Sequence, residues 1–171
     1  MAKGKLLKPN KILIIRFSSL GDLVLTTPIF RELKRIFPQS QITMLTSTVD
    51  GSVLKNNPHI DNFIWHKRRE SYSELNKLIK KLQKENFDII FDAHRSLRSI
   101  WIVWHLTIFR LYKRPNVWLI NKRSWQRILL INFKINFLKN TLSQRMNLLL
   151  PLQKETGLLL NNHTEFILQY K

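Results

Sequence analysis

A single carboxylate stands in a turn that follows the first apolar run of the chain. The run Lys11–Phe17 has the length of a strand, and Ser18, Ser19, Gly21 and Asp22 come directly after it. An ionised carboxylate within reach of a hydroxyl acts as a general base, and small residues let a substrate approach the backbone. Asp22 is therefore a candidate catalytic base. The alternative is local, because an aspartate in the first turn of a helix commonly offsets the helix dipole or caps the backbone.

Basic side chains follow a later apolar run, Phe87–Asp92, and these are His94, Arg95 and Arg98. Guanidinium groups form paired hydrogen bonds with phosphates and carboxylates. If both runs are parallel strands, their carboxyl ends meet at one edge of the sheet, where open α/β proteins bind ligands. We therefore expect an anion-binding group of residues beside Asp22. The alternative for Arg98 is a solvated arginine at the start of a helix.

Other kinds of site find little support in the residues. The turn before Asp22 has one glycine and no following lysine, so it matches neither a dinucleotide-binding fingerprint nor a P-loop. His94 and His105 lack the spacing of metal ligands, and the chain has no cysteine. We therefore expect neither a resident cofactor nor a metal ion.

Hydrophobic periodicity predicts strands that alternate with helices, and hence an α/β domain with a mostly parallel sheet. The first strand should lie centrally, because residues 12–15 are all apolar. Pro28 interrupts the first helix, which either kinks there or restarts as a second piece capped by Thr26 or Thr27. The expected strands are 11–17, 41–46, a short one ending at 65, 87–92 and 117–120, and the expected helices are 23–37, 73–85, 97–112 and 141–155. Residues 126–138 are ambiguous. The stretch 47–57 is turn-rich, and the loop Thr46–Gly51 should reach the same sheet edge as Asp22.

Charge limits the choice of partners. The 171 residues include 29 Lys and Arg against 11 Asp and Glu, a formal charge of +18, and no acid lies between Asp92 and Glu155. Such a surface attracts nucleic acid, an anionic membrane leaflet or a phosphorylated substrate, unless it is merely a solvated basic face. The longest apolar run, Ile100–Phe109, is too short to span a membrane. The default expectation is a cytoplasmic protein.

The aromatic residues of the run after Leu97 allow two interpretations. Trp101, Trp104, Phe109 and Tyr112 could face anionic lipid together with the basic residues Arg110, Lys113 and Arg114. Packing beneath the sheet is the more common fate of such a run and is the favoured interpretation.

Three ordered motifs resemble the family 9 glycosyltransferases, the lipopolysaccharide heptosyltransferases. Ile12–Phe37 is similar to the first strand–helix unit of that family, including its SS-x-GD element and the following T-T-P. Asn57–Asp61 resembles the family's short N-P-x-I/V-D link. Asn86–Ser99 resembles a second element, in which a strand ends in D-(A/L)-(Q/H) and a basic residue and a serine follow. His94-Arg95 departs from the usual Gln-Gly at that point.

The resemblance implies the N-terminal half of a GT-B glycosyltransferase, a Rossmann-like parallel sheet with flanking helices. The implied reaction is metal-independent transfer of heptose, with inversion, from ADP-heptose to the inner core of lipopolysaccharide. In the family the catalytic aspartate lies in the SS-x-GD element and so carries over to Asp22, and the basic residue of the second element, which helps hold the anionic acceptor, carries over to Arg98. We expect Ser18, Ser19, Gly21, His94 and Arg95 to contribute to the same acceptor site.

The resemblance implies a basic tail, 1–10, and one acceptor-side domain, 11–171. It also implies that the C-terminal domain, which binds ADP-heptose, is absent from this chain, and that the chain is inactive alone. The expected partners are an anionic lipid-linked acceptor of the Kdo–lipid A type, the inner leaflet of the inner membrane and a separate C-terminal domain, with no specific nucleic acid. The alternative is a non-enzymatic basic module that binds nucleic acid or an anionic membrane, although no RNA-recognition signature or basic zipper is present.

Overall fold

The computed structural model describes residues 8–67, 71–108 and 114–119, and every structural statement below concerns these residues. Five strands form one parallel sheet in the order β3-β2-β1-β4-β5. The strands are β1 (Lys11–Ile15), β2 (Gln41–Ser47), β3 (Asn62–His66), β4 (Ile89–Asp92) and β5 (Asn116–Leu119). The helices are α1 (Leu20–Ile36), the 3-10 helix η1 (Gly51–Leu54), α2 (Tyr72–Glu85) and α3 (Leu97–Ile108).

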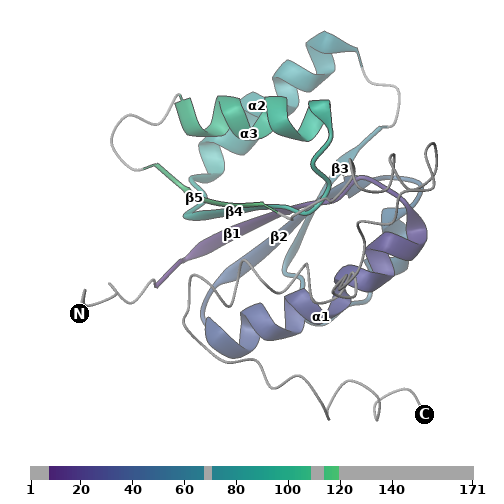
Figure 1. Cartoon of the computed structure of the whole chain (residues 1–171), viewed down its shortest axis with the longest axis vertical. Helices are drawn as coiled ribbons and strands as arrows, with labels where there is room; N and C mark the ends of the chain where they lie inside the picture. The colour runs from purple at the N-terminus through teal and green to yellow at the C-terminus, as the bar shows by residue number, and fades with distance from the viewer. Residues whose placement is uncertain (1–7, 68–70, 109–113, 120–171) are drawn as a thin grey trace, which may run out of the picture.

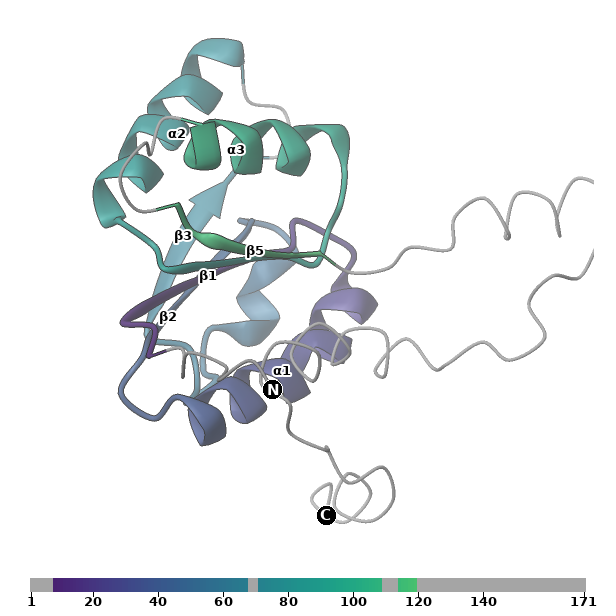
Figure 2. The same cartoon turned by 60° about the vertical axis from the view of Figure 1, so that its left-hand side comes forward.

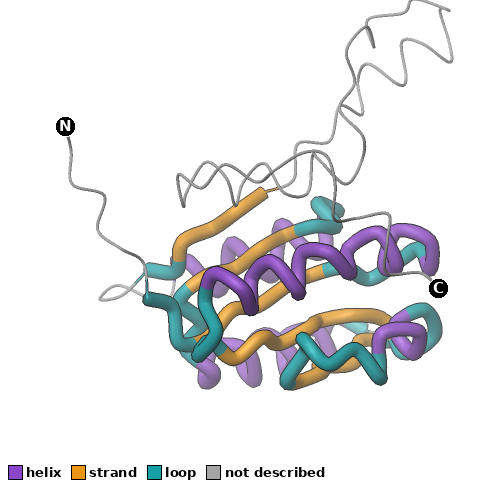
Figure 3. Tube along the Cα trace, turned by 90° about the horizontal axis from the view of Figure 1, so that it is seen from below, coloured by secondary structure: helices purple, strands orange, loops and turns teal. Residues whose placement is uncertain are grey.

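The predicted α/β fold with β1 at the centre of the sheet is confirmed. Side chains alternate along β1, so that Ile12 and Ile14 face one core and Leu13 and Ile15 face another. All four are fully buried, because helices cover both faces of the sheet. Figures 1 and 2 show α1 on one face and α2 and α3 side by side on the other, and Figure 3 shows the strands between the two helical layers.

The chain order creates a switch point in the middle of the sheet. From β1 the chain passes to β2 and β3 on one side, then returns across β1 to form β4 and β5 on the other. The connections that leave the carboxyl ends of β1 and β4 therefore run to opposite faces of the sheet. In open α/β sheets this divergence leaves a crevice in which ligands bind.

Helix α1 begins earlier than periodicity predicts and does not break at its proline. It starts at Leu20, so Gly21 and Asp22 lie in its first turn, and it continues through Pro28 to Ile36. The interpretation of two separately capped pieces is therefore wrong. Helix α2 begins at a serine cap: Ser71 and Glu74 bond reciprocally, and these hydrogen bonds hold the pKa of Glu74 below its ordinary value.

Helix α3 is the element that departs most from expectation. Its inner face packs on the sheet, but Trp101 and Trp104 lie on the outer face and are each about half exposed. The favoured interpretation, that these aromatics pack beneath the sheet, is therefore wrong for both. Within the described ranges, no helix has the length and apolar character needed to cross a membrane.

Several expected features fall outside the described residues. These are most of the basic tail, the helix expected at 141–155, the ambiguous stretch 126–138 and Phe109, Arg110, Tyr112 and Lys113. At the start of the described chain, the Asn10 amide donates to Asp88 at 2.8 Å and the Asn10 carbonyl accepts from Gln41 at 2.7 Å. Asn10 is therefore bonded to the sheet.

Gly51, at the start of η1, packs too closely for a side chain. A Cβ there would lie 2.3 Å from Cγ2 of Thr46 and 3.0 Å from the Trp65 ring. We expect Gly51→Ala to lower the free energy of unfolding by about 1–3 kcal/mol, as overpacked sites do. Gly21→Ala is the matched control, because no atom lies within 4 Å of a Cβ at Gly21. Chemical denaturation of both variants measures the difference, and equal stabilities would contradict the packing at Gly51.

Candidate active site

The candidate residues lie at the carboxyl edge of the sheet, on the two segments that leave the switch point. Ser18 and Ser19 follow β1 and lead into α1, which carries Asp22. His94 and Arg95 follow β4, and Arg98 lies in the first turn of α3. The structure thus brings the two motifs to one edge, as the parallel arrangement predicted.

A buried arginine joins these two segments. Arg16, directly after β1, has a side chain only 5% exposed and forms an ion pair with the Asp22 carboxylate. Its Nε donates to the carbonyl of Ser18 at 3.0 Å, and its Nη1 donates to the carbonyl of Ala93 after β4. One guanidinium therefore fixes the turn before α1, the segment after β4 and the candidate base.

Asp22 also has the local role that the sequence left open. It is the third residue of α1, and its Oδ2 accepts from the Ser19 amide at 3.5 Å and from the Ser19 hydroxyl at 3.2 Å. The carboxylate thus caps the helix start and pairs with Arg16 at once. These contacts fix the position of the carboxylate, and a general base must be held within reach of the proton it accepts. The side chain is still 30% exposed, so an incoming group has access to it.

Asp92, at the end of β4, organises the opposite wall. It is fully buried, and its Oδ1 accepts from the amides of His94 at 3.0 Å and Arg95 at 2.7 Å. Its Oδ2 accepts from the Ser99 hydroxyl at 2.8 Å, and Ser99 in turn accepts from the Ser96 amide at 2.8 Å. All of these bonds are internal to the segment. Asp92 is therefore a structural carboxylate that shapes the connection between β4 and α3.

A second basic contact closes the edge near β3. Nη1 of Arg98 lies 2.8 Å from Nε2 of the buried His66, and because a guanidinium only donates, His66 accepts through this nitrogen. The Phe17 ring lies between His66 and His94, with ring centroids 4.9 Å and 5.1 Å away. These contacts hold Arg98 and both imidazoles around one hollow.

The hollow has a volume of about 430 Å³. His66, His94, Arg98 and Asp50 supply its ionisable groups, and Phe17, Ser18, Ser47, Ser96 and Leu97 complete its wall. Asp50 is held in place by Ser47, whose hydroxyl donates to it at 3.1 Å. Asp22 does not line this hollow, but Arg16 bonds both the Asp22 carboxylate and the carbonyl of Ser18, which does line it. The hollow therefore offers a ligand one guanidinium, two imidazoles and one carboxylate, and the Arg98 guanidinium suits an anionic group of that ligand.

Sequence reasoning missed three of these residues. The sequence predicts no role for Arg16, which lies within the apolar run Lys11–Phe17, or for His66 and Asp50. The signal for Arg16 was available: a charge after four buried strand positions must find partners within the protein. His66 and Asp50 carry no comparable signal, because their place depends on the pairing of β3 with β2. Among the described residues, no three His, Asp or Glu side chains are placed to hold a metal ion.

Two expected site residues have a different geometry from the one their types suggested. Gly21 lies inside α1 and is exposed, so it serves no tight turn, and its contribution to acceptor access stays a prediction. Arg95 has a φ of 50°, in the left-handed region that favours glycine. The family pattern has glycine at this point, so the chain carries an arginine on a backbone suited to glycine.

Comparison with known proteins gives a consistent result. The chain is 26% identical over 121 residues to a Haemophilus influenzae protein named "Putative glycosyltransferase", an alignment that covers 69% of this chain and 35% of that protein. No protein-family model matches the chain.

Two solved structures share the fold. The family 9 glycosyl transferase of Veillonella parvula superposes with a TM-score of 0.56 at 23% identity, over 67% of this chain and 37% of that one. The E. coli heptosyltransferase WaaC with ADP-2-deoxy-2-fluoro heptose superposes with a TM-score of 0.66 at 17% identity, over 90% of this chain and 50% of that one. The predicted resemblance to the N-terminal part of family 9 glycosyltransferases is thus confirmed, and the chain spans about a third to a half of the length of these proteins.

The backbone at Arg95 yields a stability test. We expect Arg95→Gly to be more stable than Arg95→Ala by about 1 kcal/mol, because alanine keeps the Cβ that the left-handed region disfavours. Both variants remove the whole side chain beyond Cβ, so the difference isolates the backbone. Denaturation curves of the two variants measure it. An alanine variant as stable as the glycine variant would show that the backbone does not hold a left-handed Arg95.

Proposed function

We propose that this chain is the acceptor-side half of an inverting, metal-independent glycosyltransferase that moves heptose from ADP-heptose to the inner core of lipopolysaccharide. The observation that carries the proposal is the Arg16–Asp22 ion pair at the switch point. Arg16 holds this carboxylate and also bonds the carbonyl of Ser18, which lines the same hollow as Arg98. The shared fold with WaaC, seen with a fluorinated ADP-heptose, supports the sugar donor.

In this mechanism a hydroxyl of the acceptor approaches the Asp22 carboxylate. The hydroxyl loses its proton to Asp22 as its oxygen attacks the anomeric carbon of the heptose. The bond from that carbon to the ADP oxygen breaks, ADP leaves with the electron pair, and attack from the opposite face inverts the anomeric centre. Arg16 holds the Asp22 carboxylate in position for this proton transfer.

The basic residues have the complementary task of holding the acceptor. A Kdo–lipid A type acceptor carries carboxylates and phosphates, which suit the guanidinium of Arg98 and the nearby Arg95. His94 and Ser18 line the hollow, and Ser19 and Gly21 lie between Ser18 and Asp22 in the chain, so all four have a place in the acceptor site of this proposal. The donor is held by a second domain, and the reaction takes place at the cytoplasmic face of the inner membrane, where such an acceptor presents its sugar.

The proposal predicts a specific effect of Asp22→Asn in a two-domain protein that carries this chain as its acceptor-side half. We expect kcat per folded molecule to fall by about 10²–10⁴, because the variant removes the base but keeps the size of the side chain. The acceptor KM should change little. Loss of the ion pair with a buried guanidinium should also lower stability by about 1–3 kcal/mol.

Asp61→Asn is the matched control for that loss of stability. Asp61 pairs with Lys34 at 2.8 Å and accepts from the Ile42 amide at 2.6 Å, and its side chain is 35% exposed, close to the value for Asp22. It lies before β3, at the opposite edge of the sheet. ADP release and thermal melting compare the variants. Equal turnover per folded molecule in both would mean that Asp22 only caps the helix.

A further inference from the structure

One helix of this domain is apolar on two sides. The inner face of α3 packs on the sheet through Ile102, Val103 and Leu106. Its outer face carries a second apolar row at helical spacing, which we name the α3 stripe: Leu97, Ile100, Trp101, Trp104 and Ile108, each 44–89% exposed. Clustered exposed apolar side chains mark a surface that meets another apolar phase.

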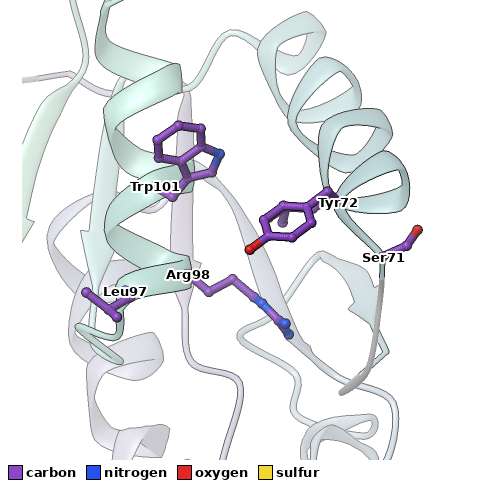
Figure 4. Close-up of a pocket in the computed structure, with 6 residues that line it drawn as sticks. Ser71, Tyr72, Leu97, Arg98 and Trp101 are labelled. Atoms are coloured by element: carbon purple, nitrogen blue, oxygen red, sulfur yellow. The ribbon is translucent and has the colours of Figure 1, made fainter.

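A hollow of about 660 Å³ lies next to the α3 stripe, on the side that faces α2. It lies between the starts of the two helices and is lined by Leu75, Leu97, Trp101, Tyr72, Ser71 and Arg98. Figure 4 shows Tyr72 and Arg98 reaching into the gap from opposite helices. Leu97 and Arg98 also line the hollow at the carboxyl edge, so an apolar recess adjoins the polar one.

The aromatic residues of the stripe have the character of side chains found at bilayer interfaces. The Trp101 and Trp104 rings stack with centroids 5.5 Å apart, and His105 packs against both at 4.4 Å and 4.9 Å. Tryptophan favours the zone between acyl chains and headgroups, because its ring is apolar and its N–H is polar.

The surroundings of the stripe are positively charged. On the neighbouring helix α2, the exposed charged residues are Glu74, which caps the helix start, and the four lysines Lys77, Lys80, Lys81 and Lys84. Among the described residues that follow β4, which are 93–108 and 114–119, there is no Asp or Glu. Basic residues around an apolar surface complement the negative potential of an anionic leaflet.

We propose that the α3 stripe and the adjoining recess dock this protein on an anionic phospholipid bilayer. A second copy of the chain fits the face poorly, since its net charge of +18 would be brought against an equal charge. Nucleic acid would use the lysines but not the aliphatic Leu97, Ile100 and Ile108. The inference deepens the proposed function by stating how the protein reaches a lipid-linked acceptor, yet the docking itself requires no acceptor.

The test is co-sedimentation of the full chain with vesicles that contain no sugar acceptor, made of phosphatidylcholine alone or mixed with anionic phosphatidylglycerol. We expect binding to the mixed vesicles, weakening as salt rises. Trp101→Ala/Trp104→Ala should weaken this binding about tenfold or more, since it removes two half-exposed tryptophans.

Trp65→Ala is the control, because Trp65 is also about 40% exposed but lies away from the α3 stripe. It stacks on Phe63, whose side chain packs against the core on the α1 side of the sheet. Circular dichroism establishes that the variants are folded. Equal binding to both kinds of vesicle, equal weakening by the control, or tighter binding to duplex DNA at the same salt would each overturn the proposal. The vesicles contain no acceptor, so any of these results would leave the glycosyl transfer proposal intact. In the same way, a failed Asp22 test would leave the docking proposal intact.

Discussion

The arrangement of the whole carboxyl edge depends on the burial of one guanidinium. Arg16 follows four fully buried strand residues, so its charge enters the protein at the centre of the sheet. A charge in that position is tolerated only with partners, and Arg16 finds three: the carbonyls of Ser18 and Ala93 and the carboxylate of Asp22. These partners belong to the segments that diverge at the switch point, so satisfying the charge also fixes the relative position of the two segments.

Because of this constraint, the capping contacts of Asp22 are compatible with the catalytic role proposed for it. The capping contacts from Ser19 and the ion pair with Arg16 set the position of the carboxylate before any substrate arrives. Asp92 does the same for the opposite wall through the amides of His94 and Arg95. A site assembled in advance spends less binding energy on ordering its own groups when the acceptor binds.

The sequence predicted most of the elements, because continuous apolar runs and helical periodicity depend on neighbouring residues. It also placed Asp22 and His94–Arg98 at one edge, since parallel strands leave little choice. It did not reveal the role of Arg16, whose contact with Ala93 spans 77 positions, or that of His66, which meets Arg98 across 32 positions. The orientation of Trp101 and Trp104 was missed for a different reason: α3 is apolar on both sides, so its pattern does not distinguish the inner face from the outer one.

The most direct test of the central claim, that this edge is an acceptor site, is a backbone amide NMR titration of the chain with the deacylated, phosphorylated headgroup of a Kdo–lipid A acceptor. The account predicts the largest shift changes at Ser18–Asp22 and His94–Arg98, with Asn10 and Asp61 at the opposite edge nearly unchanged. Shift changes centred on the opposite edge, or none at all at the switch point, would contradict it.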